Sequence, residues 1–252
     1  MYDITTMSSN YANLAGILAG FSFSGVYLLI EYEKRDSSEV VGILFAGFFG
    51  LILAAFLFSN ISRISYDPGS PELMKELAFN VVIASIIFCI AVIQMFVSLV
   101  FIFILYRLSK LVISLGKIIY YETALITAMF ITTTIPRLYL IDDPNTGLVK
   151  DLFLTGLVFV LLIFILSKIF MKKLDRIFEK NFLQIVAGIT VLMVMLVGIF
   201  RSRIYLGEIP VLFPHFLNLL YILIIMVNGF SINHEYRMMM LKDQEINERA
   251  EL

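Results

Sequence analysis

Four polar side chains lie inside long apolar segments and are the residues of this sequence best suited to carry chemistry: Gln94, Ser98, Glu122 and Asn218. Polar and ionisable groups inside a membrane are costly and often mark a solute or ion path. Glu122 could bind a cation or a proton in a cavity, or it could reach the interface or pair with Lys117 or Arg107. Gln94 and Ser98 are four residues apart and so share one helix face. We treat these residues as a candidate polar pathway, with hydrogen bonds between helices as the alternative.

The remainder of the sequence offers no catalytic or metal-binding set. Its two histidines, His215 and His234, are predicted on opposite membrane faces, which argues against multi-histidine zinc or bis-histidine haem sites. No phosphate-binding loop and no HExxH motif occur. Cys89 is the one cysteine, and a net charge of -1 gives no reason to propose nucleic-acid binding. We therefore expect a non-enzymatic protein without a cofactor or a metal.

The composition indicates an integral membrane protein. Of 252 residues, 60% are hydrophobic and 15% are charged, whereas soluble domains have about 45–50% apolar and about 25% charged residues. A helix needs about 20 apolar residues to cross a bilayer. The predicted fold is a single all-α, multi-pass transmembrane helical bundle over residues 1–252, with a short charged cytoplasmic tail at 231–252. We predict about seven spans: Tyr11–Ile30, Val40–Ser59, Ala78–Tyr106, Ile118–Leu140, Leu152–Phe170, Phe182–Phe200 and Val211–Phe230.

The distribution of basic residues predicts the orientation. With seven spans, 13 lysines and arginines lie on one side and 6 on the other, which accounts for all 19. The side richer in basic residues should be cytoplasmic, so the N-terminus is predicted outside and the C-terminus inside, in the plasma membrane. The segment Lys168–Lys180 alternates basic and apolar residues, which suits contact with anionic headgroups at the cytoplasmic surface.

Small residues recur every four positions in the first two spans, and each set forms a ridge along its helix. The first ridge is Ala12, Gly16, Gly20 and Ser24, and the second is Gly42, Ala46, Gly50 and Ala54. Helices in lipid associate through close backbone contact at such residues. The ridges could join the two spans as a hairpin, or one ridge could face another subunit, and both could hold.

Helix ends are marked at two places. Ser70 followed by Pro71 fits an N-cap with proline at the first helical position, which would begin the third helix before the bilayer. Pro136 follows three threonines, whose hydroxyls can satisfy backbone groups freed by a kink. The third predicted span is longer than a bilayer needs and would tilt or protrude.

Packing ridges combined with few buried charges favour an oligomeric channel, pore or membrane effector that contacts the lipid bilayer and itself. A small-solute or ion-coupled secondary transporter is the first alternative. A membrane-embedded lipid-modifying enzyme and a signalling sensor are the others.

Overall fold

The computed structural model describes residues 4–31, 38–64, 70–138, 147–165 and 212–250. These residues contain six helices long and apolar enough to cross a membrane, and no strand occurs among them. The predicted all-helical class is confirmed, and the helices are compatible with a multi-pass membrane protein. The predicted span Phe182–Phe200 and the basic segment Lys168–Lys180 lie outside the described residues.

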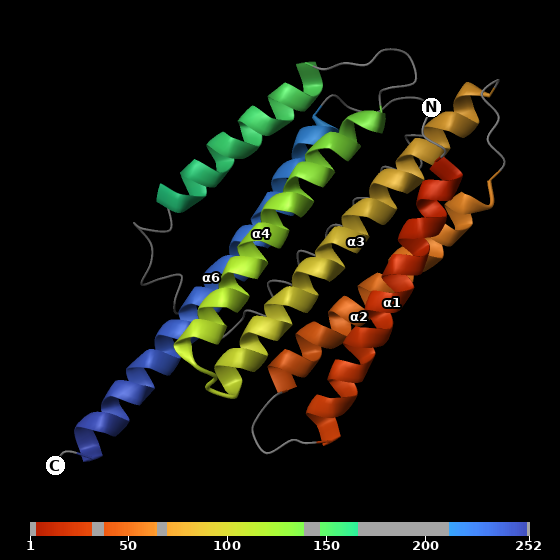
Figure 1. The fold of residues 1–252 in the computed structure, drawn as a ribbon. Helices are drawn as coiled ribbons and strands as arrows, with labels where there is room; N and C mark the ends of the chain where they lie inside the picture. Colours follow the sequence, from red (N-terminus) through yellow and green to blue (C-terminus); the bar gives the residue numbers. More distant parts are fainter. Residues whose placement is uncertain (1–3, 32–37, 65–69, 139–146, 166–211, 251–252) are drawn as a thin grey trace.

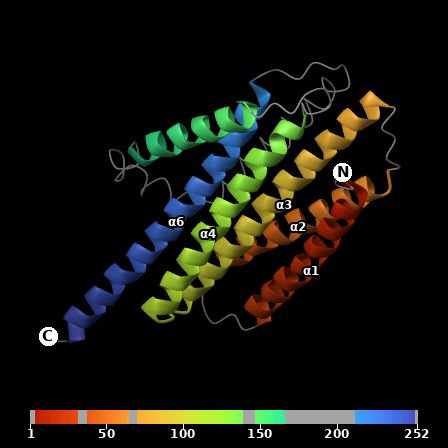
Figure 2. The ribbon, with the colours of Figure 1, turned by 45° about the horizontal axis from the view of Figure 1, so that its top comes forward.

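The helices are arranged as a bundle of long, roughly aligned rods (Figure 1). They are α1 (Ile4–Glu31), α2 (Ser38–Ser62), α3 (Pro71–Leu105), α4 (Lys110–Thr134), the 3-10 helix η1 (Ile135–Leu138), the helix Gly147–Ile165 and α6 (Phe213–Ala250). Each of the first four long helices runs opposite to the one before it. The helix Gly147–Ile165 and α6 run in the same direction as each other, and α6 extends beyond the bundle at its C-terminal end (Figures 1 and 2).

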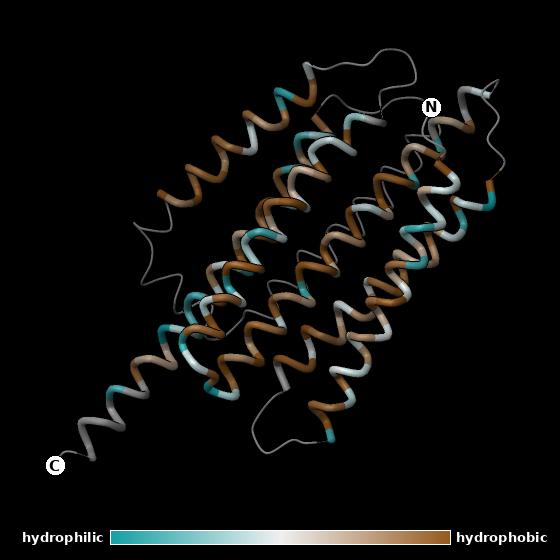
Figure 3. Tube along the Cα trace, in the orientation of Figure 1, coloured by the Kyte–Doolittle hydropathy of each residue, from teal (hydrophilic) through white to brown (hydrophobic). Residues whose placement is uncertain are grey.

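The long helix α3 occupies the centre of the bundle, between α2 on one side and α4 and α6 on the other (Figure 1). Within an apolar stretch of 18 residues, 67% of the residues of α3 are buried, compared with 28% in α1 and 11% in the helix Gly147–Ile165. Most residues along α3 are hydrophobic (Figure 3), and they leave no separate polar face, as expected for a helix enclosed by others. At about 1.5 Å per residue its 35 residues span about 52 Å, so α3 is longer than a perpendicular crossing requires.

Several helix ends differ from the ends of the predicted spans: α1 begins at Ile4 and α4 at Lys110, ahead of Tyr11 and Ile118, and the C-terminal ends of α4 and α6 differ as well. Instead of kinking and continuing to Leu140, α4 ends at Thr134 and passes into η1. Pro136 explains this end, because proline lacks an N–H donor and its ring clashes with the preceding turn. The helix that contains the seventh predicted span continues past Phe230 to Ala250. Residues 231–250 contain neither glycine nor proline, so nothing in this segment interrupts the helix.

The start of α3 agrees with the prediction. Its first residue is Pro71, and Ser70 is the N-cap in an extended conformation, although the Ser70 side chain makes no capping hydrogen bond. Proline is favoured at this position because the first helical N–H has no partner within the helix. The two-residue signal therefore located this helix end correctly.

Candidate functional site

Buried polar side chains gather along the line where α3, α4 and α6 meet. We call this set the polar seam; it comprises Cys89 of α3, Tyr120, Thr127 and Thr132 of α4, and Asn218, Tyr221 and Asn228 of α6. Each of these residues is buried. Polar groups enclosed by apolar helices must find hydrogen-bond partners within the protein or leave a free-energy cost. The partners therefore decide what each member of the seam does.

At one end of the seam, Asn218 ties three helices together. Its Oδ1 accepts a hydrogen bond from the Thr132 hydroxyl of α4 at 3.1 Å, and its Nδ2 donates to the Leu152 carbonyl at 3.0 Å. Gly156 lets the helix Gly147–Ile165 come close, because a Cβ there would lie 2.9 Å from Ile222 Cδ1. Both ends of the Asn218 amide are thus engaged, which gives this residue a structural role.

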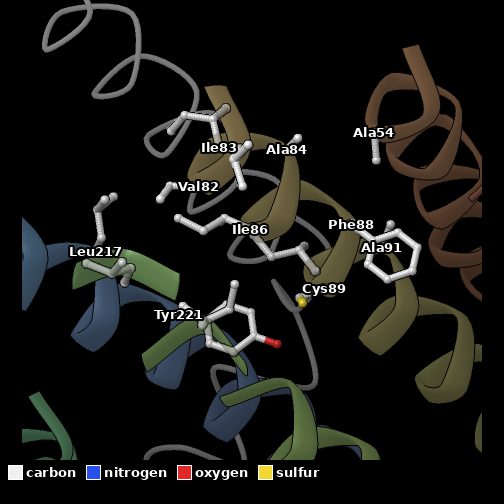
Figure 4. Close-up of a cluster of buried hydrophobic side chains, with 14 of the residues drawn as sticks. Ala54, Val82, Ile83, Ala84, Ile86, Phe88, Cys89, Ala91, Leu217 and Tyr221 are labelled. Carbon is white, nitrogen blue, oxygen red and sulfur yellow. The ribbon is translucent and has the colours of Figure 1, made fainter. Parts of the chain in front are cut away.

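In the middle of the seam, the Tyr221 hydroxyl is buried without a hydrogen bond. The side chain reaches from α6 toward α3, where the Cys89 thiol lies beside it (Figure 4). Thr127 of α4 is also near the Tyr221 hydroxyl. The Thr127 hydroxyl donates instead to the backbone carbonyls of Thr123 and Ala124, at 2.8 and 3.1 Å. Cys89 and Thr127 are near enough to interact with the Tyr221 hydroxyl, but among the described residues none has the distance and angle of a hydrogen bond to it. A buried polar group left in this state costs about 1–3 kcal/mol.

Further along α6, a second donor is in the same state. Asn228 is 1% exposed, and its Nδ2 has no partner in the part of the chain that the structure describes. It follows Tyr221 by seven residues, which places both on one face of α6 about 10 Å apart along the axis. Between them, the Tyr120 hydroxyl donates to the Ile225 carbonyl at 2.7 Å. The seam thus holds two unpaired donors in line.

The seam is electrically neutral. The buried polar residues of the described segments include no aspartate, glutamate, lysine or arginine. No group of three or more histidine, cysteine, aspartate or glutamate side chains that could hold a metal occurs in those segments. The chemistry available along the seam is therefore hydrogen bonding through hydroxyl and amide groups.

The structure separates the four residues proposed as a polar pathway. Gln94 and Ser98 lie on the side of α3 that faces α2, where a Cβ on Gly47 would be 3.6 Å from Gln94 Cβ. The Ser98 hydroxyl donates to the Gln94 backbone carbonyl at 2.7 Å. Glu122 is exposed on the outer face of α4. Of the four, only Asn218 belongs to the polar seam.

The first small-residue ridge faces away from the protein. Gly16, Gly20 and Ser24 are exposed, and a Cβ on either glycine would have nothing within 4 Å. The face of α1 that packs inward carries Ala15, Ala19, Ser22, Val26 and Leu29 instead. In particular, the Ser22 hydroxyl donates to the Leu44 carbonyl of α2 at 3.0 Å. Ala12 is half-buried at the edge of this face.

The second ridge turns from the surface into the core. Gly42 and Ala46 are exposed, whereas Ala54 is fully buried. Gly50 lies against α3, since a Cβ there would be 2.8 Å from Ala91 Cβ. The C-terminal half of this ridge, Gly50 and Ala54, therefore packs within the chain, and its N-terminal half, Gly42 and Ala46, does not.

Sequence reasoning missed Tyr120, Thr127 and Tyr221. Tyrosine is usually expected at membrane interfaces, so a tyrosine inside a span does not by itself indicate a functional site. A signal was available, because Asn218, Tyr221 and Asn228 are spaced by three and seven residues and share one helix face.

Comparison with known proteins gives no functional lead. The chain matches no protein-family model, and no curated protein or solved structure is significantly similar to it.

Proposed function

We propose that this chain is a non-enzymatic membrane transport protein in which a small polar species crosses the bilayer along the polar seam. The observation that carries this proposal is the pair of buried, unpaired donors on Tyr221 and Asn228. A bilayer interior has no water to satisfy such groups. Two unpaired donors lie on one buried face of α6. We explain them by a polar species that forms hydrogen bonds with both donors as it crosses the membrane.

The arrangement of the seam also suits a gated path. From Asn218 to Asn228 the seam extends over ten residues of α6, about 15 Å, roughly half of a hydrocarbon core of about 30 Å. The hydrogen bonds of Asn218 to α4 and to the helix Gly147–Ile165 close one end of it. Passage along the seam would require these bonds to open, as in a gated channel or a transporter.

A flux measurement tests the proposal. We would reconstitute the purified protein in liposomes and measure the fluxes of water, urea, glycerol, K⁺, Na⁺, Cl⁻ and protons. The proposal predicts that at least one flux exceeds that of protein-free vesicles and falls in the double variant Tyr221→Phe/Asn228→Leu. The matched control is Tyr27→Phe/Asn60→Leu, at exposed positions of α1 and α2. Fluxes equal to those of empty vesicles for every species would refute the proposal.

We further propose seven crossings, with the N-terminus outside and the C-terminus inside the plasma membrane. The helix Gly147–Ile165 and α6 run in the same direction. If both cross the bilayer, an odd number of crossings separates them, and this supports the proposed crossing at Phe182–Phe200. The excess of basic residues supports the orientation and contact of Lys168–Lys180 with anionic lipid. Epitope tags at the two ends should be accessible from opposite sides of the membrane. Tags accessible from the same side would contradict this topology.

Self-association through α1 is a second proposal. It is supported by the outward direction of Gly16 and Gly20, where an added Cβ would have nothing within 4 Å. The opposite face of α1 is already buried against the rest of the bundle. Small residues at a lipid-facing surface allow the backbone of a second copy to come close. The size distribution in detergent and in lipid nanodiscs tests this proposal, and a strictly monomeric protein would refute it.

A further inference from the structure

We infer that the polar seam selects small uncharged solutes that accept hydrogen bonds, in the size class of water, urea and glycerol, and that it excludes ions. This inference rests on the proposed transport function and specifies its substrate class.

The unpaired groups decide the polarity of the solute. The Asn228 amide nitrogen can only donate hydrogen bonds, whereas the Tyr221 hydroxyl can donate and accept, and each lacks a partner within the described segments. The neighbouring donors are occupied, because the hydroxyls of Thr127, Tyr120 and Thr132 donate to groups of the protein. A species that stabilises the seam must therefore offer lone pairs. Oxygen atoms of water, alcohols and amides have this property.

The absence of charge in the seam decides against ions. A cation would meet the positive ends of the two donors, with no buried carboxylate in the described residues to balance it. An anion would be attracted by the donors, but it would find no buried lysine or arginine in the same part of the chain. An ion taken into an apolar interior without a counter-charge loses its hydration and gains too little in return. A neutral solute avoids this loss.

The surroundings of the donors limit the size of the solute. Around Tyr221 the wall consists of Cys89 and Ile86 of α3 (Figure 4), both nearly fully buried. Close packing of this kind leaves few voids larger than a water molecule, so a solute passes only where the helices move slightly apart, and a small solute requires the least movement. The solute therefore passes the two donors one molecule at a time.

The test compares neutral and ionic fluxes in the same vesicles. For the wild-type protein we expect urea and glycerol permeabilities above those of empty vesicles, measured by stopped-flow light scattering. Fluxes of K⁺, Na⁺ and Cl⁻ should stay at the level of empty vesicles. Tyr221→Phe and Asn228→Leu should each lower the neutral permeability about five-fold, the effect of one lost hydrogen bond. Their melting temperatures should be unchanged or raised, because each substitution removes an unpaired buried donor.

Tyr27→Phe and Asn60→Leu make the same chemical changes at exposed positions and should alter neither permeability nor melting temperature. Ion flux exceeding neutral flux would overturn the inference while leaving the transport function standing. No flux of any species would overturn both. Wild-type permeability in Tyr221→Phe and Asn228→Leu, or a clearly lowered melting temperature in Tyr221→Phe, would also overturn the inference, since the donors would then be irrelevant or already paired.

Discussion

Two glycines of α2 allow one chemical change to be compared in two surroundings. An added Cβ at Gly50 would lie 2.8 Å from Ala91 Cβ and 3.7 Å from Ala91 Cα, whereas an added Cβ at Gly42 would have nothing within 4 Å. Carbon atoms pack favourably at about 3.5–4.0 Å. Gly50→Ala therefore forces α2 away from α3 by somewhat under an ångström, and Gly42→Ala forces no movement.

The expected free energies follow from two opposing effects. Alanine is favoured over glycine inside a helix by about 1 kcal/mol, and this gain applies to both variants. Overpacking of a close contact costs about 1–3 kcal/mol, and this cost applies to Gly50→Ala alone because its clash is with a backbone-proximal methyl group. We expect Gly42→Ala to be slightly more stable than wild type. Gly50→Ala should be about 1–3 kcal/mol less stable than Gly42→Ala.

Unfolding by sodium dodecyl sulfate in mixed micelles, followed by circular dichroism, measures this difference directly. Both variants lie in the same helix and carry the same substitution, so effects on the unfolded state largely cancel. Equal unfolding free energies for the two variants would refute the close contact of α2 with α3 at Ala91. A less stable Gly42→Ala would show that its surroundings are filled.

Three further predictions use the same preparations. Asn218→Leu should lower the unfolding free energy by about 1–3 kcal/mol, because it leaves the Thr132 hydroxyl without its acceptor in the structure; an unchanged midpoint in the detergent titration would contradict the structural role of this amide. Gly20→Leu should keep the stability of the protomer within about 0.5 kcal/mol and shift the size distribution in nanodiscs toward monomers, and an unshifted distribution would count against the α1 interface. Glu122→Gln should leave every liposome flux within about two-fold of wild type, since Glu122 is exposed on the outer face of α4. A large loss of flux in this variant would show that Glu122 takes part in transport.

The helices themselves were predictable because the length of an apolar segment is a strong signal in a membrane protein. All six described spans overlap a predicted one. Their ends were less predictable. Continuation of α6 beyond Phe230 follows from residues with good helix propensity, but propensity alone did not say that the apolar span and the charged tail would form one helix.

The ridges show why small-residue spacing did not identify the face of α1 that packs against α2. At 3.6 residues per turn, a step of four residues rotates by about 40°, so the ridge from Ala12 to Ser24 sweeps about 120° around the helix. The packed face keeps its direction by alternating steps of four and three, from Ala15 through Ala19, Ser22 and Val26. A ridge of uniform step cannot follow a neighbouring helix for its whole length.

The polar seam was harder to predict because the protein is surrounded by lipid instead of water. In water, the polar side of a helix reveals which side is buried. In lipid, the side facing acyl chains and the side facing protein are equally apolar, and α3 has no separate polar face. The sequence could therefore show that Gln94, Asn218 and Asn228 were costly. It could not show that Gln94 lies against α2, whereas Asn218 bonds to α4 and to the helix Gly147–Ile165 and Asn228 is buried without a partner for its amide nitrogen. That distinction depends on the order in which the helices surround α3, and it is this order that leaves Tyr221 and Asn228 on one line with no partner in the described chain.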